Sequence, residues 1–355
     1  MNSLFDSLSL RGVTFRNRVW VSPMCQYSAH NGFVAPWHQV HLGSFSSGGV
    51  GLIMVEATGV VPEGRITIGC LSIEDDEHAQ AFRPIVEFAH SQGAKIGIQL
   101  AHGGRKASTM QPGSDHLMAS PSEGGWQAVA PSAIAYEGYP EPRELTGVEI
   151  KSLVESFAAA ALRAIKVGFD VIEIHAAHGY LLHQFYSPIA NTRTDEYGGD
   201  FDGRTRFLRE VVEAVRNVIP NETPLFVRIS ATDWVDEGWN IIDSIELSHV
   251  LKKLGVDLID VSTGGNVHKA PIKATPGYQV PFAAAIRKEA EIPTTAVGLI
   301  TEPEQAQYIV ETGEADAVFL ARALLRNPRW ALSAAEKLGI KIDWPIQLEW
   351  ARTLT

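Results

Sequence analysis

The chain has 355 residues and a formal net charge of −11, with 45% hydrophobic and 20% charged residues. This is the balance of an ordinary globular protein, and the negative charge argues against nonspecific binding to nucleic acid or to anionic membranes. No apolar run approaches the ~18 residues of a membrane span, and the first residues lack the basic and apolar segments of a secretory signal. We therefore expect a cytoplasmic protein. Its only cysteines, Cys25 and Cys70, predict neither a disulfide framework nor a Cys-rich metal site.

Eight short segments are apolar at nearly every position and rich in Val and Ile, which is typical of strands covered on both faces. In chain order they are residues 18–24, 51–56, 95–100, 170–175, 225–230, 258–263, 294–299 and 317–322.

Amphipathic stretches between these segments predict helices. They are residues 75–92, 146–168, 201–219, 241–254, 281–290 and 303–312. Several end in a Gly that tolerates a left-handed cap, after which a strand begins within a few residues. Strand and helix alternate eight times, so we expect one (β/α)8 barrel domain over residues 1–355. The alternative is a doubly wound open sheet, which usually carries a Gly-rich loop after its first strand, where this chain has Ser22-Pro23-Met24-Cys25.

Two segments lie outside this repeat. The opening "SLSLRGVTFRNR" predicts a hairpin around Arg11 and Gly12 that would cap the N-terminal end of the barrel. The connection after the third strand, residues 101–144, is long and rich in Gly, Pro and Ser. Loops of this length in compact domains are usually lids or binding loops.

Barrel enzymes carry their chemistry where the strands end, and several strand ends here hold groups suited to a flavin nucleotide. Gln99 offers a donor and an acceptor to the edge of a flavin pyrimidine. Arg228 would stabilise the negative charge of a reduced flavin. Gly298 would let backbone N–H groups approach a phosphate, and Arg322 would add a charge-assisted donor.

The fourth strand ends in "EIHAAHGYL", which holds His175, His178 and Tyr180. Two imidazoles three residues apart can both donate to one carbonyl oxygen and stabilise a developing enolate, as an oxyanion hole does. The Tyr180 hydroxyl can deliver a proton to carbon. The histidines could instead be structural or bind a metal, although their spacing matches neither a helical HExxH site nor a Cys/His cluster.

Long motifs along nearly the whole chain resemble those of the Old Yellow Enzyme family, and look most like its thermophilic-like subclass with xenobiotic reductases. The matching segments are "SPMCQY" at 22–27, "GLIMVEATGV" at 51–60, "IGIQLAHGGRKA" at 96–107, "GFDVIEIHAAHGYLLHQF" at 168–185, "SPIANTRTDEYGG" at 187–199, "RTRFLREVVEAV" at 204–215, "AVGLI" at 296–300 and "ARALLRNP" at 321–328.

The resemblance implies noncovalent FMN, NADPH or NADH as reductant, and an activated alkene as substrate. Hydride would pass from the reduced flavin N5 to the β-carbon of an α,β-unsaturated carbonyl or nitro compound. His175 and His178 would bind the substrate oxygen, Tyr180 would donate the proton, and Tyr27 would contact substrate. Relatives carry Gly at the position of Ala321, so the backbone contact there departs from the pattern. The flavin contacts would be Ser22, Pro23, Met24, Cys25, Ala57, Gln99, Arg228, Gly265, Gly298, Ala321 and Arg322.

The C-terminal tail "DWPIQLEWARTLT" carries Trp344, Trp350 and Arg352. In the subclass that the chain resembles, a C-terminal Arg or Trp reaches the active site of a neighbouring subunit. By position Trp350 is the matching residue, with Arg352 a substitute, and the resemblance implies a homodimer or homotetramer. The alternative is that both Trp side chains pack against their own barrel.

Two other functions stay open from the sequence. A metal-dependent hydrolase could use the same fold, because fold alone does not fix chemistry. A noncatalytic FMN-binding redox sensor would bind flavin without turnover. A buried charge needs a partner, and we expect Glu56 or Glu173 to pair with Arg228.

Overall fold

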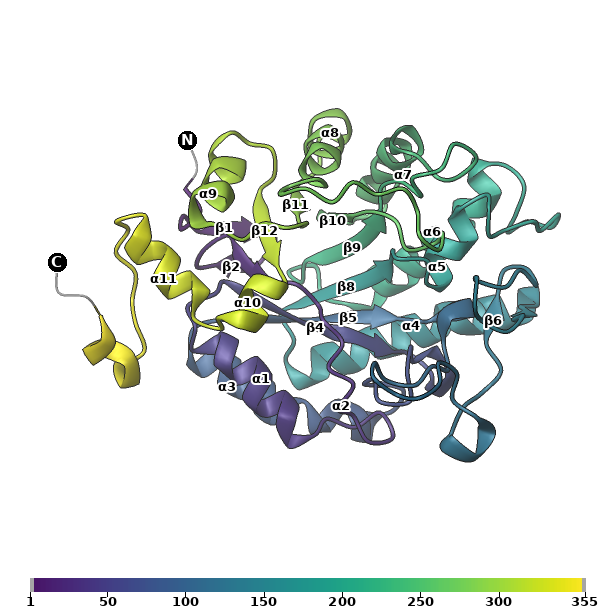
Figure 1. Cartoon of the computed structure of the whole chain (residues 1–355), viewed down its shortest axis with the longest axis horizontal. Coiled ribbons are helices and arrows are strands. Elements are labelled where there is room, and N and C mark those ends of the chain that lie inside the picture. Colours follow the sequence, from purple (N-terminus) through teal and green to yellow (C-terminus); the bar gives the residue numbers. More distant parts are fainter. Residues whose placement is uncertain (1–2, 353–355) are drawn as a thin grey trace.

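The computed structural model describes residues 3–352, and eight parallel strands form a closed barrel at its centre (Figure 1). Around the barrel the strands follow the order β10-β11-β12-β3-β4-β5-β8-β9. This confirms the predicted (β/α)8 barrel and excludes the doubly wound open sheet. The strands are β3 (Val19–Val21), β4 (Leu52–Gly59), β5 (Lys95–Ala101), β8 (Val171–Ala176), β9 (Leu225–Ser230), β10 (Leu258–Ser262), β11 (Thr294–Ala296) and β12 (Ala317–Leu320).

The first barrel strand is shorter than its apolar run predicts. The Ser22 N–H still donates to the Leu320 carbonyl at 3.0 Å, but Pro23 follows and has no N–H to continue the ladder. The seventh strand stops at Ala296, just before Gly298 with its φ of +115°. Both ends therefore turn away from the sheet at the face where ligands bind in barrel enzymes.

Helices form the outer layer of the barrel (Figure 1). Five agree with the predicted segments, namely α4 (Gly147–Val167), α6 (Phe201–Val218), α7 (Ile241–Lys253), α8 (Val280–Ala290) and α9 (Pro303–Glu311). Four were not predicted, namely α1 (Pro36–Ser46), α5 (Leu181–Tyr186), α10 (Arg322–Arg326) and α11 (Trp330–Lys337).

The helix predicted over residues 75–92 is wrong as a single element. It forms α2 (Asp76–Ala81) and α3 (Arg83–Ser91), which meet at Phe82. Pro84 lies in the first turn of α3, where its missing N–H is no loss, but it could not occupy the middle of a longer helix.

The predicted N-terminal hairpin is present and closes one end of the barrel. Strand β1 (Leu8–Leu10) pairs antiparallel with β2 (Val13–Phe15). The Phe15 ring lies 4.7 Å from that of Trp20, and Trp20 stacks on Phe226 at 5.8 Å. Trp20 and Phe226 lie near the starts of β3 and β9. The rings of Phe15, Trp20 and Phe226, which we call the aromatic floor, therefore seal the N-terminal end of the barrel and leave the C-terminal end for other groups.

The connection after β5 is as long as predicted and contains only short elements. These are the 3-10 turns η2 (Gly104–Lys106) and η3 (Pro121–Glu123) and the two-residue strands β6 (Val129–Ala130) and β7 (Arg143–Glu144). It leads into α4, where the Thr146 and Glu149 side chains cap each other's backbone N–H groups. Among residues 3–352, no helix is both long and apolar enough to cross a bilayer.

Candidate active site

A polar layer fills the barrel above the aromatic floor. The Gln99 amide donates to Glu173 Oε1 at 2.7 Å, and Arg228 Nε lies 3.0 Å from Asp260 Oδ2. The Thr295 hydroxyl donates to the other Asp260 oxygen at 2.8 Å. All five side chains are buried, so the barrel holds a closely coupled set of ionisable groups.

The expected ion pair between Arg228 and Glu56 is wrong. Arg228 faces Asp260, its register partner on the neighbouring strand. The pairing of β4 with β5 shifts register between Val55 and Ala57, which gives the inward position to Ala57 in place of Glu56. Glu56 instead lies 3.2 Å from His38 of α1. The other expected partner, Glu173, does not form the ion pair with Arg228 either. Its carboxyl group accepts from Gln99, and the charge of Arg228 only opposes the rise of the Glu173 pKa.

Burial, followed by the charge of Asp260, raises the pKa of Glu173 to about 8. A carboxyl group kept neutral in this way can donate a hydrogen bond as well as accept one. Within residues 3–352, Glu173 Oε2 has no hydrogen-bond partner. The layer therefore presents a free polar atom in the barrel interior, close to the predicted flavin contact Gln99.

The structure brings His175, His178 and Tyr180 together at the end of β8. The ring centroids of His175 and His178 lie 5.2 Å apart, and those of His175 and Tyr180 lie 5.1 Å apart. Burial, followed by the charge of Arg228, lowers the pKa of both imidazoles well below the usual value. Each ring is therefore neutral and carries one N–H. His175 Nδ1 is buried without a hydrogen-bond partner in the described chain.

Three groups that the sequence analysis missed hold His178 in place. Its backbone N–H donates to the Ser230 hydroxyl at 2.9 Å, and its Nε2 shares a 2.7 Å hydrogen bond with the Ser262 hydroxyl. The Lys106 ammonium donates to the carbonyls of His178 and Gly265, both at 2.8 Å. Lys106 lies inside the "GGRKA" motif after the third strand, which was the one available signal for it.

Gly265, predicted as a flavin contact, lies against the backbone of His178. Both residues have positive φ, 92° and 58°. A Cβ on Gly265 would lie 2.5 Å from the His178 Cα, so this close approach requires glycine. Whether Gly265 also touches a cofactor stays a prediction.

The ends of β11 and β12 enclose a cavity of about 180 Å³. Gly298, Ala321 and Arg322, all predicted at the phosphate end of FMN, contribute to its wall. Arg326 adds a second cationic side chain to the wall. Gln279 also lines the cavity, and its Oε1 accepts a 2.6 Å hydrogen bond from the Thr263 hydroxyl. A cationic hollow beside a left-handed glycine fits a phosphate group. Sequence reasoning missed Gln279 and Arg326.

The end of the first strand supplies the other side of the site. Cys25 and Tyr180 both pack against a small cluster that contains Ala57. Ala57 pairs in register with Gln99. Of the remaining predicted contacts, Ser22 is buried, Pro23, Met24 and Ala321 are intermediate in exposure, and Tyr27 and Arg322 lie at the surface.

Contacts run without a break around this face of the barrel. Cys25 packs near Tyr180, Tyr180 meets His175, and His178 bonds to Ser262. Ser262 and Thr263 bond in turn to Gln279, which lines the phosphate-sized cavity. The structure thus links Cys25, Tyr180 and the two histidines to the phosphate-sized cavity along one face of the barrel. His175 and His178 belong to neither of the two clusters of potential metal ligands within residues 3–352.

The tail does not pack on its own barrel at its second tryptophan. A 3-10 segment, η4 (Ile346–Ala351), follows a turn after α11 and extends away from the barrel (Figure 1). Trp350 is fully exposed, whereas Trp344 is half-buried and lines a surface hollow with Arg352. The alternative that both Trp side chains are packed is therefore wrong for Trp350. The last tail residues, Thr353, Leu354 and Thr355, lie outside the described residues.

Together, the barrel, the cationic phosphate-sized cavity and the polar layer beside it define a flavin-nucleotide oxidoreductase. A family model described as "NADH:flavin oxidoreductase / NADH oxidase family" matches residues 3–340. The chain belongs to this family, that of Old Yellow Enzyme, and its cofactors are FMN and NAD(P)H as reductant.

Named relatives agree with this assignment. The chain is 49% identical to an NADPH dehydrogenase of Geobacillus thermodenitrificans, over 98% of this chain and 97% of the relative. It is 47% identical to one of Bacillus subtilis, over 98% of each. Among solved structures, morphinone reductase in complex with tetrahydroNAD matches with a TM-score of 0.80 and 27% identity, over 97% and 93% of the chains. An Old Yellow Enzyme homologue from Zymomonas mobilis matches at 0.79 and 29%, over 98% and 96%.

Proposed function

We propose that this NADPH dehydrogenase is an ene-reductase that saturates the C=C bond of α,β-unsaturated carbonyl or nitro compounds. One observation carries the proposal: two neutral imidazoles, one with an unpartnered buried nitrogen, lie beside a tyrosine at the rim of the barrel. Neutral N–H donors on neighbouring rings suit an oxygen that gains negative charge during the reaction.

Bound FMN would accept hydride from NAD(P)H and supply it to the alkene. Gly298, Ala321 and Arg322 would hold its phosphate, where the cavity offers room and positive charge. The ring-end contacts that we propose are Ser22, Pro23, Met24, Cys25, Ala57, Gln99, Arg228 and Gly265.

His175 and His178 would hold the substrate oxygen and thereby polarise the alkene. Tyr180 would give a proton to the carbon next to the polarised group. Burial, followed by the Cys25 thiol, raises the pKa of Tyr180 well above its usual value, so the phenol keeps its proton until a strongly basic carbon develops. Tyr27, at the surface beside Cys25, would contact the substrate at the mouth of the site.

We also propose that the tail completes the site of a neighbouring subunit. Trp350 is fully exposed on a segment that extends from its own barrel, and exposed aromatic surface is typical of an interaction site. A homodimer or homotetramer of this kind has a self-complementary interface.

The experiment that tests the proposed function is an anaerobic titration of the purified protein. We expect a yellow protein whose FMN is released on denaturation. In the native protein, NADPH should bleach the flavin, and 2-cyclohexenone should then restore its colour. A protein that is bleached but not reoxidised by any activated alkene would be a redox sensor or another kind of dehydrogenase, and the proposal would fail.

A further inference from the structure

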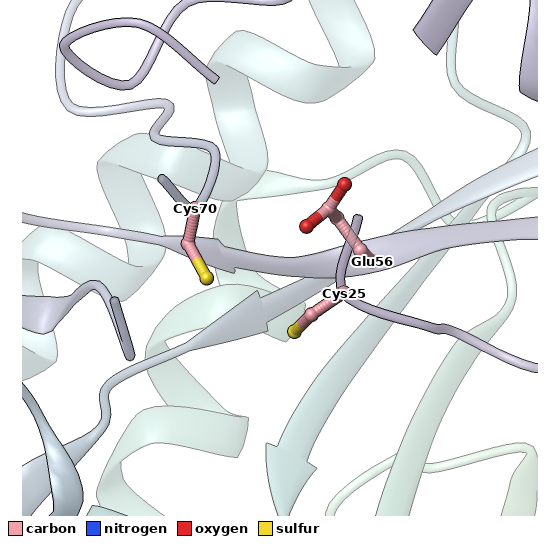
Figure 2. Close-up of side chains that lie close together, drawn as sticks. All are labelled: Cys25, Glu56 and Cys70. Atoms are coloured by element: carbon pink, nitrogen blue, oxygen red, sulfur yellow. The ribbon is translucent and has the colours of Figure 1, made fainter. Parts of the chain in front are cut away.

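The only two cysteines of the chain meet beside the proposed active site (Figure 2). Cys25 follows β3, whereas Cys70 lies after the 3-10 turn η1 (Pro62–Gly64). Their Sγ atoms and a carboxylate oxygen of Glu56 all lie within 4.8 Å of one another. Cys70 and Glu56 are buried and Cys25 is half-buried. Three potential ligands therefore converge from three separate segments.

The Glu56 carboxylate is held in a fixed orientation toward this point. Its Oε2 accepts a 3.0 Å hydrogen bond from the Gln26 N–H. Its Oε1 lies 3.2 Å from His38 Nε2, yet it is a buried oxygen without a well-formed hydrogen bond. The Ala35 N–H donates to His38 Nδ1 at 2.9 Å, which leaves the ring proton on Nε2, facing the carboxylate. Hydrogen-bonded carboxylates of this kind are typical of metal sites.

We propose that Cys25, Cys70 and Glu56 bind a thiophilic divalent cation such as Zn²⁺. Two sulfurs and one oxygen are ligands that zinc accepts, and three protein ligands leave a fourth position open. On a tetrahedral ion such ligand atoms lie roughly 3–4 Å apart, so small side-chain rotations from the present arrangement suffice. Binding forms two metal–thiolate bonds and one metal–carboxylate bond, and it releases the two thiol protons to solvent.

The proposed ion site lies close both to solvent and to the proposed active site. Cys25 is half-buried, and Tyr180 packs against the same small cluster as Cys25 and Cys70. An ion bound here would occupy the first-strand side of the site, and it would coordinate Cys25, a proposed flavin contact. We therefore expect Zn²⁺ to inhibit NADPH oxidation, an activity that the chain has irrespective of its alkene substrate.

The test titrates the anaerobic holoenzyme, with both cysteines kept as thiols, with Cd²⁺ and records the ultraviolet thiolate-to-cadmium absorption band. We expect about one Cd²⁺ per chain in the parent protein. Cys70→Ser should weaken binding by at least about tenfold and diminish the band. Glu56→Gln should keep the band but weaken binding by a similar factor. Asp75→Asn is the matched control, because it disrupts the separate surface cluster of Glu74, Asp75 and His78 without touching either thiol.

Inhibition gives a second readout. Cys70 is outside the proposed flavin and substrate contacts, so Cys70→Ser should oxidise NADPH at the parental rate and should resist Zn²⁺ at least about tenfold better. The proposal fails if the reduced parent shows no thiolate band, or if Cys70→Ser binds Cd²⁺ as tightly as the parent. Equal binding by Glu56→Gln would remove Glu56 from the ligand set.

Discussion

The Tyr180 and His175 rings lie 5.1 Å apart, which is close enough for both to contact one substrate in the proposed reaction. Only the step that consumes the alkene needs a proton on carbon, so Tyr180→Phe should slow reoxidation by an enone by about 10²–10⁴-fold. Reduction by NADPH should change far less. Stopped-flow traces of the two half-reactions measure the difference, with Tyr308→Phe on the exposed face of α9 as control. Equal slowing of both would make Tyr180 a positioning residue.

The imidazoles at 175 and 178 should act as donors to oxygen. Removing one oxyanion donor costs about 10²–10³ in rate, and we expect that loss in enone reduction for His175→Ala and for His178→Ala. Both variants should also bind phenols more weakly, because a phenolate mimics the charged oxygen of the reaction. The long-wavelength charge-transfer band of the phenol complex reports this affinity. His249→Ala, exposed on α7, should leave both measurements unchanged.

Glu173 gives the protein a pH-dependent stability. Its pKa is about 8 in the fold, against 4.5 in an unperturbed chain, and burial is the main cause. Between these values the folded state holds a proton that the unfolded state has lost, so this group makes stability fall as pH rises. The melting temperature of the Glu173→Gln holoenzyme should therefore fall less than that of the parent between about pH 5 and about pH 8. Glu213→Gln, exposed on α6, is the control, and identical pH profiles for parent and Glu173→Gln would contradict the assignment.

The convergence of residues that share one motif could be predicted from the sequence, whereas contacts made by a neighbouring loop could not. His175, His178 and Tyr180 lie in one motif at one strand end. The Lys106 ammonium donates hydrogen bonds to the carbonyls of His178 and Gly265. The sequence around Lys106 does not indicate which residues it would contact. The partner of Arg228 was mistaken because the register shift in β4 is not encoded in its apolar pattern.

At the scale of elements, two loops interlock at the rim. The loop after β10 brings Gly265 against His178, and a Cβ there would lie 2.5 Å from the His178 Cα. Gly265→Ala should shift His178, lower phenol affinity and destabilise the fold by about 1–3 kcal/mol. Gly199→Ala is a matched control, because Gly199 also has positive φ but its Cβ would meet open space. Binding titrations and thermal melts should separate the two variants, and equal phenol affinities would show that the interlock does not position His178.

The strands could be predicted because each is covered on both faces and most of them are rich in apolar residues. Their ends were less accurate, since β3 and β11 leave the sheet where Pro23 and Gly298 change the backbone. The short helices at the rim were missed for a related reason. α5 and α10 have only six and five residues, which is too little chain for a helical period to appear.

At the scale of the whole molecule, the tail prediction concerns assembly. Trp350→Ala should lower substrate affinity more than it lowers stability, and deletion of residues after Pro345 should weaken both substrate binding and self-association. Steady-state kinetics and sedimentation velocity at the assay concentration measure these effects. Tyr308→Ala, at another exposed aromatic position, is the control. A parent protein that is fully active as a monomer would rule out a shared site.

The aromatic floor and the reactive rim lie at opposite ends of the same eight strands, and this has a consequence for laboratory evolution. Substitutions near Trp20 and Phe226 should alter folding free energy with little change in substrate choice, because the polar layer separates them from the rim. Most activity-altering substitutions destabilise their host, so a reserve of stability widens the set that can be tolerated. Reinforcing the floor first, and then randomising the connection at residues 101–144, is therefore the more productive order for extending the substrate range.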